Sequence, residues 1–330
     1  MARRQLASIF GVFALSVFAI GPAQAADSYP SKPIRLIVPF SAGASSDISA
    51  RRVSEVMART LGQPIVVENI PGAGGVVGIQ KFLQQPSDGY TLLAGSISTH
   101  GINPHIHSAL PYDPIKDFAP ISRISSFPNI LVVHPSLNVK TLPELVEKVK
   151  EAARDGKPLT YASGGKGSTS HLGGEQLKQA AGAELTHVPY SSVSVAMPDF
   201  LSGRVPIMFG NMTVVQPFIE KGTIVAIANT GERRSNLLPE LKTVEEQGFR
   251  NMQLSAWIGL FAKAGTPPEV LKKLNAAATK AVASEEVKKT FDGLGKVAES
   301  DESAEHFAEF VRKETEKWGA VVKAANIQEQ

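Results

Sequence analysis

The sequence predicts an α/β protein built as two lobes, each a sheet of apolar strands covered by helices. Short β-branched runs alternate with amphipathic helices from Ile34 onward, which is typical of a largely parallel sheet with both faces covered. A second series of the same kind begins at Ile130. Two matching turns rich in serine and glycine, 38–47 and 161–171, join a predicted strand to a predicted helix, one in each series.

The first 25 residues have the pattern of a cleaved signal peptide. Arg3 and Arg4 precede an uncharged apolar run over 6–20, and Ala23-Gln24-Ala25 is a small-x-small cleavage sequence. The run is too short to cross a bilayer comfortably. We therefore expect a mature chain that begins at Ala26 or Asp27 and is located in the periplasm. The export route, general or twin-arginine, stays open.

Composition excludes several classes of function. The 330 residues include no cysteine, so there is no disulfide, thiol nucleophile or lipid-modified N-terminal cysteine. The formal net charge of +3 falls to +1 once Arg3 and Arg4 leave with the leader, and this near-neutral chain argues against nucleic acid as a partner. About 305 remaining residues are enough for two modest domains.

The first series places its elements between residues 34 and 94. Strands are expected at 34–38, 65–70 and 91–94, and a helix at 47–61 ends at Gly62. Four prolines and the lack of a clear period predict a long surface loop over 103–120.

The second series continues to the C-terminus. Its expected strands are 130–133, 159–162, 185–188, 207–209, 225–228 and 256–262. Its expected helices are one opened by the capping box at 141–144, then 168–181, 193–202, 270–283, 286–294 and 304–325.

The order of these elements predicts a discontinuous first lobe. If the C-terminal helices return to pack on the first series, lobe one contains 26–126 plus 255–330, and lobe two contains 127–254. The chain would then cross between the lobes near 125–129 and again near 253–257. Two crossings form a hinge, and the cleft between the lobes is the expected ligand site.

The two serine- and glycine-rich turns are candidate anion-binding sites. Such a turn offers backbone N–H groups at the positive end of a helix dipole. Ser45, Ser46 and Asp47 can equally serve only as helix caps. A third hydroxyl-rich turn at 189–194 favours ligand binding, because open α/β sheets bind ligands at the carboxyl ends of their strands.

Other motifs are weaker. The glycine-rich run 71–78 follows a strand but lacks GxGxxG spacing and a downstream acid for a ribose, so a tight turn explains it. His100, His105 and His107 lie close together, but no cysteine supports them and the nearest downstream acid is Asp113, which predicts solvated or capping loop histidines. We expect no metal and no cofactor.

Catalysis is not expected, since the chain has no GxSxG elbow and no paired carboxylates in a cleft-like loop. Serines and histidines do share loops, however, so a hydrolase using Ser168 and His171 stays open as a minor alternative. A cation is disfavoured at the start of a helix, so His171 is expected to be a neutral imidazole.

A series of segments carries a resemblance over nearly the whole mature chain. In order they are 32–40, 61–69, 71–75, 88–93, 110–114, 117–120, 187–190, 257–260 and 264–267. These segments resemble the periplasmic solute receptors of tripartite tricarboxylate transporters, the family of the Bordetella uptake gene products. The resemblance implies a type II periplasmic-binding-protein fold, a small carboxylate ligand, and delivery to a two-component membrane permease.

The resemblance also implies the ligand-binding residues. In the family, backbone amides and ordered water at the first two turns hold one ligand carboxylate. In this chain those positions, with the flanking aromatic residues, are Phe40, Ser41, Ala42, Gly43, Ser46, Asp47, Ser163, Gly167, Ser168, Thr169, His171 and Tyr190. The residues expected around the distal part of the ligand are Ser96, Thr99, Ser191, Ser194 and Asn211.

Departures from the family pattern bear on ligand choice. Ala44 replaces a frequent glycine, 191–193 reads Ser-Ser-Val where Lys-Gly-Gly is common, and Gly210 replaces a common aspartate. These changes predict a wider, more neutral distal pocket, which suits an aromatic carboxylate as well as an aliphatic one. We therefore predict a monomeric receptor for a mono- or dicarboxylate. A periplasmic sensor that presents its closed form to a signalling protein is the alternative.

Overall fold

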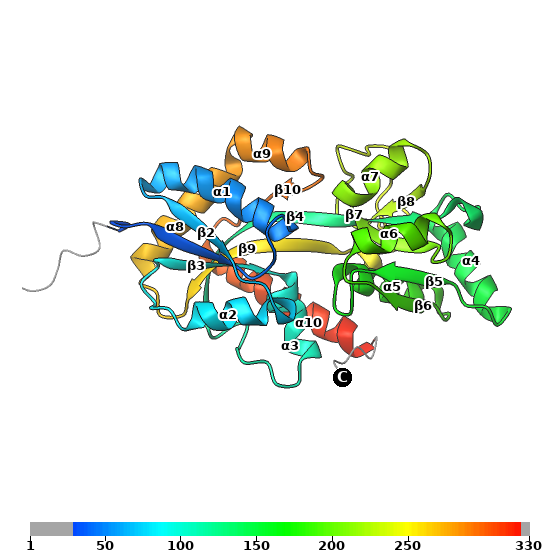
Figure 1. The fold of residues 1–330 in the computed structure, drawn as a ribbon, viewed down its shortest axis with the longest axis horizontal. Helices are drawn as coiled ribbons and strands as arrows, with labels where there is room; N and C mark the ends of the chain where they lie inside the picture. Colours follow the sequence, from blue (N-terminus) through cyan, green and yellow to red (C-terminus); the bar gives the residue numbers. More distant parts are fainter. Residues whose placement is uncertain (1–28, 325–330) are drawn as a thin grey trace, which may run out of the picture.

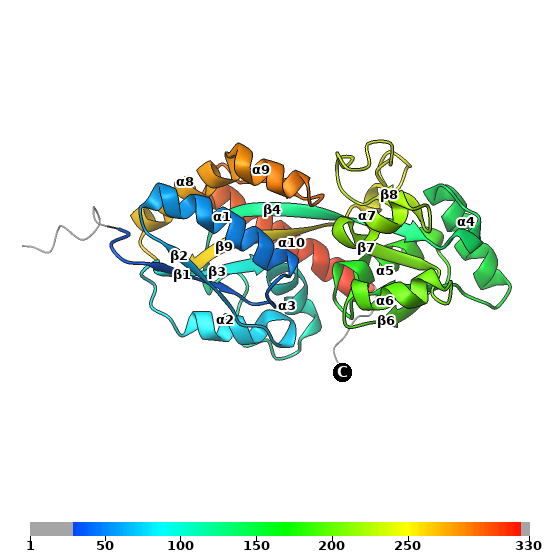
Figure 2. The same ribbon diagram turned by 45° about the horizontal axis from the view of Figure 1, so that its top comes forward.

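Two α/β halves are joined by two long neighbouring strands in the computed structural model, which describes residues 29–324. The predicted signal peptide therefore lies outside the described residues. The joining strands are β4 (Phe118–Val133) and β9 (Ser255–Lys263), which run antiparallel through the middle of the molecule (Figures 1 and 2). Within 29–324, no helix is long and apolar enough to cross a membrane.

The half on the left of Figure 1 combines the N-terminal elements with the C-terminal ones. Its N-terminal elements are β1 (Ile34–Val38), α1 (Ser45–Leu61), β2 (Ile65–Asn69), α2 (Val76–Leu83), β3 (Thr91–Ser96), the π-helical turn η2 (Ile97–Ile102) and α3 (Asn103–Ile106). Its C-terminal elements are α8 (Pro268–Ala283), α9 (Glu285–Asp292), β10 (Val297–Ala298) and α10 (Ala304–Ala324).

The sheet of this half is mixed and not parallel as the sequence predicted. Strand β1 pairs in parallel with β2 and β3, but β9 is antiparallel to both β3 and β4. The order β2-β1-β3-β9-β4 places a strand from the second part of the chain between β3 and β4. The reason is that β9 returns from the other half in the opposite direction.

The half on the right contains the middle of the chain. Its elements are α4 (Leu142–Arg154), β5 (Thr160–Ser163), α5 (Thr169–Ala181), β6 (Thr186–Pro189), α6 (Val193–Leu201), β7 (Ile207–Asn211), α7 (Met212–Glu220) and β8 (Val225–Asn229). Strand β5 is parallel to β6 and β7, whereas β7 and β8 are antiparallel to β4.

The buried apolar residues follow this division. One cluster joins N-terminal side chains such as Leu36 to C-terminal ones such as Trp257 and Trp318. In the right half, Leu131 belongs to a cluster with α4 and α5, and Ile130 to a cluster with α6. Successive side chains of β4 therefore point to opposite faces of its sheet.

The stretch 103–120, predicted as a long surface loop, is partly helical and partly buried: it begins with α3, and Tyr112 within it is buried. The histidine before it also differs from the prediction. His100 is wholly buried in η2, with its ring stacked 4.0 Å from the ring of Phe261, and burial lowers its pKa to about 3. The prediction of a loop imidazole was therefore wrong for His100. His105 bonds the carbonyl of Thr315 at 2.7 Å. Over the described residues, no group of three or more His, Cys, Asp or Glu is arranged to hold a metal.

Candidate functional site

The first turn runs from the end of β1 into α1. Ser41, Ala42 and Gly43 are exposed, and Gly43 has a φ of 79°, a conformation that glycine adopts without strain. The start of α1 has no side-chain cap. The N–H groups of its first turn are therefore left for water or a bound anion.

Asp47 supports this turn from within the protein. Its carboxylate accepts hydrogen bonds from the N–H of Gly43 at 2.9 Å, from Arg51 Nε at 2.9 Å and from Asn69 Nδ2 at 2.8 Å. Burial alone would raise the pKa of Asp47, but these bonds hold it below its usual range. Because both carboxylate oxygens are engaged and the residue is buried, Asp47 shapes the turn and does not present its side chain to the cleft.

The second turn, between β5 and α5, uses many of its N–H groups internally. Gly164 donates to Ser170 Oγ, Gly165 to Ser163 Oγ, and Gly167 to His171 Nδ1 at 3.1 Å. Ser168 caps α5 by accepting from the His171 N–H at 3.2 Å. Among the residues that the structure describes, the donors left at the start of α5 are the N–H groups of Thr169 and Ser170.

Three aromatic rings pack behind the second turn. His171 stacks on His187 with ring centroids 3.9 Å apart, and Tyr161 stacks against both, 5.0 Å from His187 and 6.4 Å from His171. Burial and the charges of His187 and Lys166 lower the pKa of His171 to about 3, and burial and Lys166 lower the pKa of His187 to about 4. Both rings are therefore neutral at pH 7, which agrees with the expectation for His171.

The third turn lies against the second. The N–H of Tyr190 donates to the Ser163 carbonyl at 3.1 Å, and a side chain at Gly165 would lie 3.4 Å from the carbonyl of Tyr190. Ser191 and Ser194 are exposed, so their hydroxyls are available. The hydroxyl of Tyr190 is engaged with Asp199 at 2.7 Å.

Contacts across the two halves bring the turns to one region. A Cβ at Gly167 would lie 2.9 Å from Ile106 Cδ1 and 3.5 Å from Ile102 Cγ2, and Leu172 of α5 packs in the left-hand core. Helix α1 begins at the end of the left half that faces the right half (Figures 1 and 2). The first turn, in the left half, and the second turn, in the right half, thus lie on the sides of the two halves that face each other.

Ser96 and Thr99 are buried behind the first turn. Thr99 Oγ1 accepts from the Ser96 N–H at 2.8 Å, and Ser96 Oγ in turn caps the Thr99 N–H, so the two residues form a capping box at the start of η2. Thr99 has no exposed surface, although its methyl group lies beside Phe40 near Gly75. In this conformation neither hydroxyl faces the cleft.

The floor between the turns is one face of β4. Ser125 Oγ donates to Ser49 of α1 at 3.0 Å, and Leu131, on the same face, packs in the core under α5. Asn129 lies between them and is the cross-strand partner of Asn211. Its side-chain amide is buried, and neither its oxygen nor its nitrogen has a hydrogen-bond partner among the described residues.

Asn129 is thus a candidate ligand contact that the sequence reasoning missed. The one available signal was an asparagine at the start of an apolar strand, which also fits a strand end. Its importance depends on the β4–β7 pairing that sets it beside Asn211.

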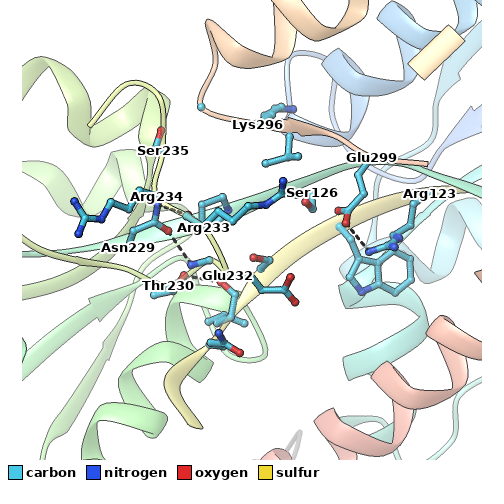
Figure 3. Close-up of a pocket in the computed structure, with 18 of the residues that line it drawn as sticks. Arg123, Ser126, Asn229, Thr230, Glu232, Arg233, Arg234, Ser235, Lys296 and Glu299 are labelled. Atoms are coloured by element: carbon cyan, nitrogen blue, oxygen red, sulfur yellow. Dashed lines mark hydrogen bonds and ion pairs between the residues drawn. The ribbon is translucent and has the colours of Figure 1, made fainter. Parts of the chain in front are cut away.

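A cavity of about 270 Å³ lies on the other face of the hinge strands (Figure 3). Ser126 and Pro128 line it, which alternate along β4 with the residues of the cleft floor. No predicted ligand residue lines it. Two of its cations have acidic partners: Arg123 lies 3.2 Å from Glu299 and 3.1 Å from Asp301, and Lys317 lies 3.4 Å from Glu314. Lys296 also lines the cavity, as do the acidic residues Glu232 and Asp292. This mixed-charge cavity is a poor site for a carboxylate.

Ser168 and His171 do not form the serine–histidine pair of a hydrolase, although Ser163 Oγ lies 2.5 Å from His187 Nε2. His171 Nδ1 accepts from the Gly167 N–H, and Ser168 Oγ donates to the Gly165 carbonyl at 2.7 Å. The described residues therefore contain no hydrogen bond between the two side chains that the hydrolase alternative requires.

Two lobes joined by antiparallel hinge strands, with the starts of helices at their junction, define a solute-binding protein of the periplasmic-binding-protein class. The comparisons agree. A solved structure described as a periplasmic transporter is 36% identical and covers 91% of this chain and 99% of its own, with a TM-score of 0.78. The periplasmic binding protein BugD is 30% identical over 91% of this chain and 100% of its own, with a TM-score of 0.75.

Residues 49–327 match the family described as the tripartite tricarboxylate transporter family receptor, and the chain belongs to this family. BugT of Bordetella pertussis is 32% identical and covers 98% of each chain. MatC from Rhodopseudomonas palustris, solved with bound malate, is 31% identical over 89% of this chain and 100% of its own, with a TM-score of 0.74. The two-lobed fold and the family resemblance predicted from the sequence are confirmed.

Proposed function

We propose that this protein is a periplasmic receptor that binds a small mono- or dicarboxylate between its lobes and delivers it to a two-component membrane permease. The observation that carries the proposal is the uncapped start of α1, which faces the second turn at the start of α5. Helix starts with unused N–H groups suit a carboxylate and offer little to a neutral sugar.

The ligand residues follow from the same geometry. Ser41, Ala42, Gly43 and Ser46 hold one carboxylate from the first turn, and Thr169 does so from the second. Ser191, Ser194 and Asn211 contact the distal part. Asp47, Gly167, Ser168 and His171 act by shaping the turns, because their polar groups are already bonded within them.

Two similar proteins solved with ligands support the ligand class. One is MatC, with malate; the other is a protein of R. palustris with adipate, which is 30% identical over 90% of this chain and 98% of its own, with a TM-score of 0.78. Both ligands are dicarboxylates. We propose that this chain binds a compound of that kind, that it closes because the ligand contacts both lobes, and that it does so as a monomer without catalysis.

A thermal-shift screen tests the proposal. The mature protein is heated with malate, adipate, aromatic carboxylates and neutral sugars, each at millimolar concentration. A carboxylate at 100 times its Kd should stabilise the native state by about 2.7 kcal/mol. Stabilisation by a neutral sugar, with no response to any carboxylate, would refute the proposed ligand class.

A further inference from the structure

Lys296 is a buried cation at the start of α1. It is 4% exposed, and its ammonium donates to the Ser45 carbonyl at 2.7 Å and to Ser49 Oγ at 2.9 Å. Ser45 is the first residue of α1. The side chain thus brings a full positive charge to the helix terminus at which the proposed carboxylate binds.

The ammonium has no acidic partner among the described residues. The groups around it are the carbonyl and hydroxyl of α1, the ring of Phe127 on β4 at 5.2 Å and the ring of Phe291 on α9 at 5.9 Å. The charged side chains of α1 are engaged elsewhere: Asp47 with Gly43 and Arg51, and Arg52 with Glu55 and Glu286. Asp292 on α9 and Lys296 both line the cavity of Figure 3, but no ion pair joins them.

A second unsatisfied group lies on the same surface. Lys296 precedes β10, whose pairing with β4 sets Val297 opposite Ser126, so Lys296 and Phe127 share one face of the sheet. Asn129 is two residues further along that face, and its buried amide has no partner in the described part of the chain. A buried charge without a counter-charge and a buried amide without a partner are each unfavourable unless a ligand completes them.

We propose that Lys296, with the amide of Asn129 on the same face of the sheet, forms an anion subsite at the start of α1 and makes the receptor selective for ligands that carry a carboxylate there. This inference rests on the proposed function, which it extends by naming the residue that sets the requirement for charge. Lys296 acts as a counter-charge close to the helix start, and Asn129 as a hydrogen-bonding group on the cleft floor.

The subsite predicts a pH dependence of binding. Burial lowers the pKa of Lys296 to about 8, so the free protein loses this charge as the pH rises through that value. At pH 9 only about a tenth of the molecules carry the charge, and the apparent Kd for an anion should be roughly tenfold higher than at pH 7. Because a bound anion favours the protonated ammonium, binding at pH 9 should also take up a proton.

Calorimetric titration of the mature protein with malate and adipate at pH 7 and pH 9 tests the inference. Lys296→Met should weaken binding about tenfold at pH 7 and remove both the pH dependence and the proton uptake, whereas Lys296→Arg should keep binding at both pH values. Lys317→Met is the matched control: Lys317 lines the same cavity of Figure 3 but already pairs with Glu314, so the variant should behave as the unaltered protein does.

The outcomes separate the two proposals. If the unaltered protein binds neither these nor the other carboxylates of the screen, the proposed function fails and the subsite falls with it. If it binds a carboxylate but Lys296→Met keeps the same affinity and pH profile, the subsite alone is overturned. Should Lys296→Met not fold, the profile of the unaltered protein still decides, because an affinity that is constant from pH 7 to 9 contradicts a charge that titrates near 8.

Discussion

At the scale of single residues, the two serine- and glycine-rich turns depend on side chains whose polar groups are bonded within the turns. Asp47 fixes the first turn through Gly43, and His171 fixes the second through Gly167. The sequence predicted both residues as ligand contacts, and the structure shows their side chains bonded within the turns. The sequence could not distinguish a residue that supports the turn from one that contacts the ligand, because that difference lies in the direction of each side chain.

Asp47→Asn tests whether the carboxylate of Asp47 supports the first turn. The amide oxygen can still accept two of the three hydrogen bonds, but the variant loses the ion pair with Arg51 and leaves one donor without an acceptor. We expect the free energy of unfolding to fall by about 1–3 kcal/mol, measured by urea denaturation. Since the pKa of Asp47 is lowered in the folded protein, this contribution is present at neutral pH and is lost as the pH falls through the lowered value.

Glu55→Gln on the same helix is the control. Glu55 pairs at the surface with Arg52, and such exposed pairs contribute little. Equal stability losses for the two variants would mean that Asp47 does not brace the turn.

At the scale of elements, most predicted strands and helices agree with the structure to within two residues. The sequence missed α7, whose nine residues include Pro217, and β10, which has two residues and exists only through its pairing with β4. Lys296 and Asn129 were missed for the same reason. Their surroundings are set by the pairing of strands far apart in the sequence, and no local pattern records it.

The stacked histidines behind α5 should make this element sensitive to acid. Their pKa values in the folded protein, about 3 and 4, lie below the usual value near 6.5. The unfolded chain therefore binds more protons between pH 6.5 and 4, and stability falls as the pH drops through that window. We expect the melting temperature to decline from pH 7 to 4.5, and His187→Gln to flatten this decline.

His134→Gln provides the comparison, because His134 lies at the surface and bonds Ser136 at 2.7 Å, away from the stack. If His187→Gln and His134→Gln leave the same decline as the unaltered protein, the stacked rings do not account for the acid sensitivity.

At the scale of the whole molecule, a change in the angle between the lobes must bend β4 and β9, because these strands join the two lobes. Trp257 lies on β9 and donates through Nε1 to Glu314 Oε2 at 3.0 Å, and Trp318 donates to the same oxygen at 2.8 Å. Glu314 and Trp318 belong to α10, which packs on the left half. One carboxylate therefore links a hinge strand to the helix behind it.

This arrangement gives a fluorescence signal for closure. In Trp318→Phe, Trp257 is the only tryptophan left, and we expect saturation with a bound carboxylate to change its emission because the strand bends against Glu314. Small-angle scattering of the unaltered protein should show a smaller radius of gyration with the ligand. Trp257→Phe, which keeps the tryptophan on α10, should show little change in emission. An unchanged radius on saturation would contradict closure.

The position of β9 affects the order in which the two halves can fold during synthesis. Strand β9, which lies between β3 and β4 in the left-hand sheet, comes from the last quarter of the chain, so β3 and β4 lack their shared neighbour until residue 263 has emerged. The right half is complete earlier, since its strands end at Asn229. We therefore expect the right half to fold first during synthesis. The left half should remain incompletely folded, with apolar surface exposed, until the C-terminal elements have been made.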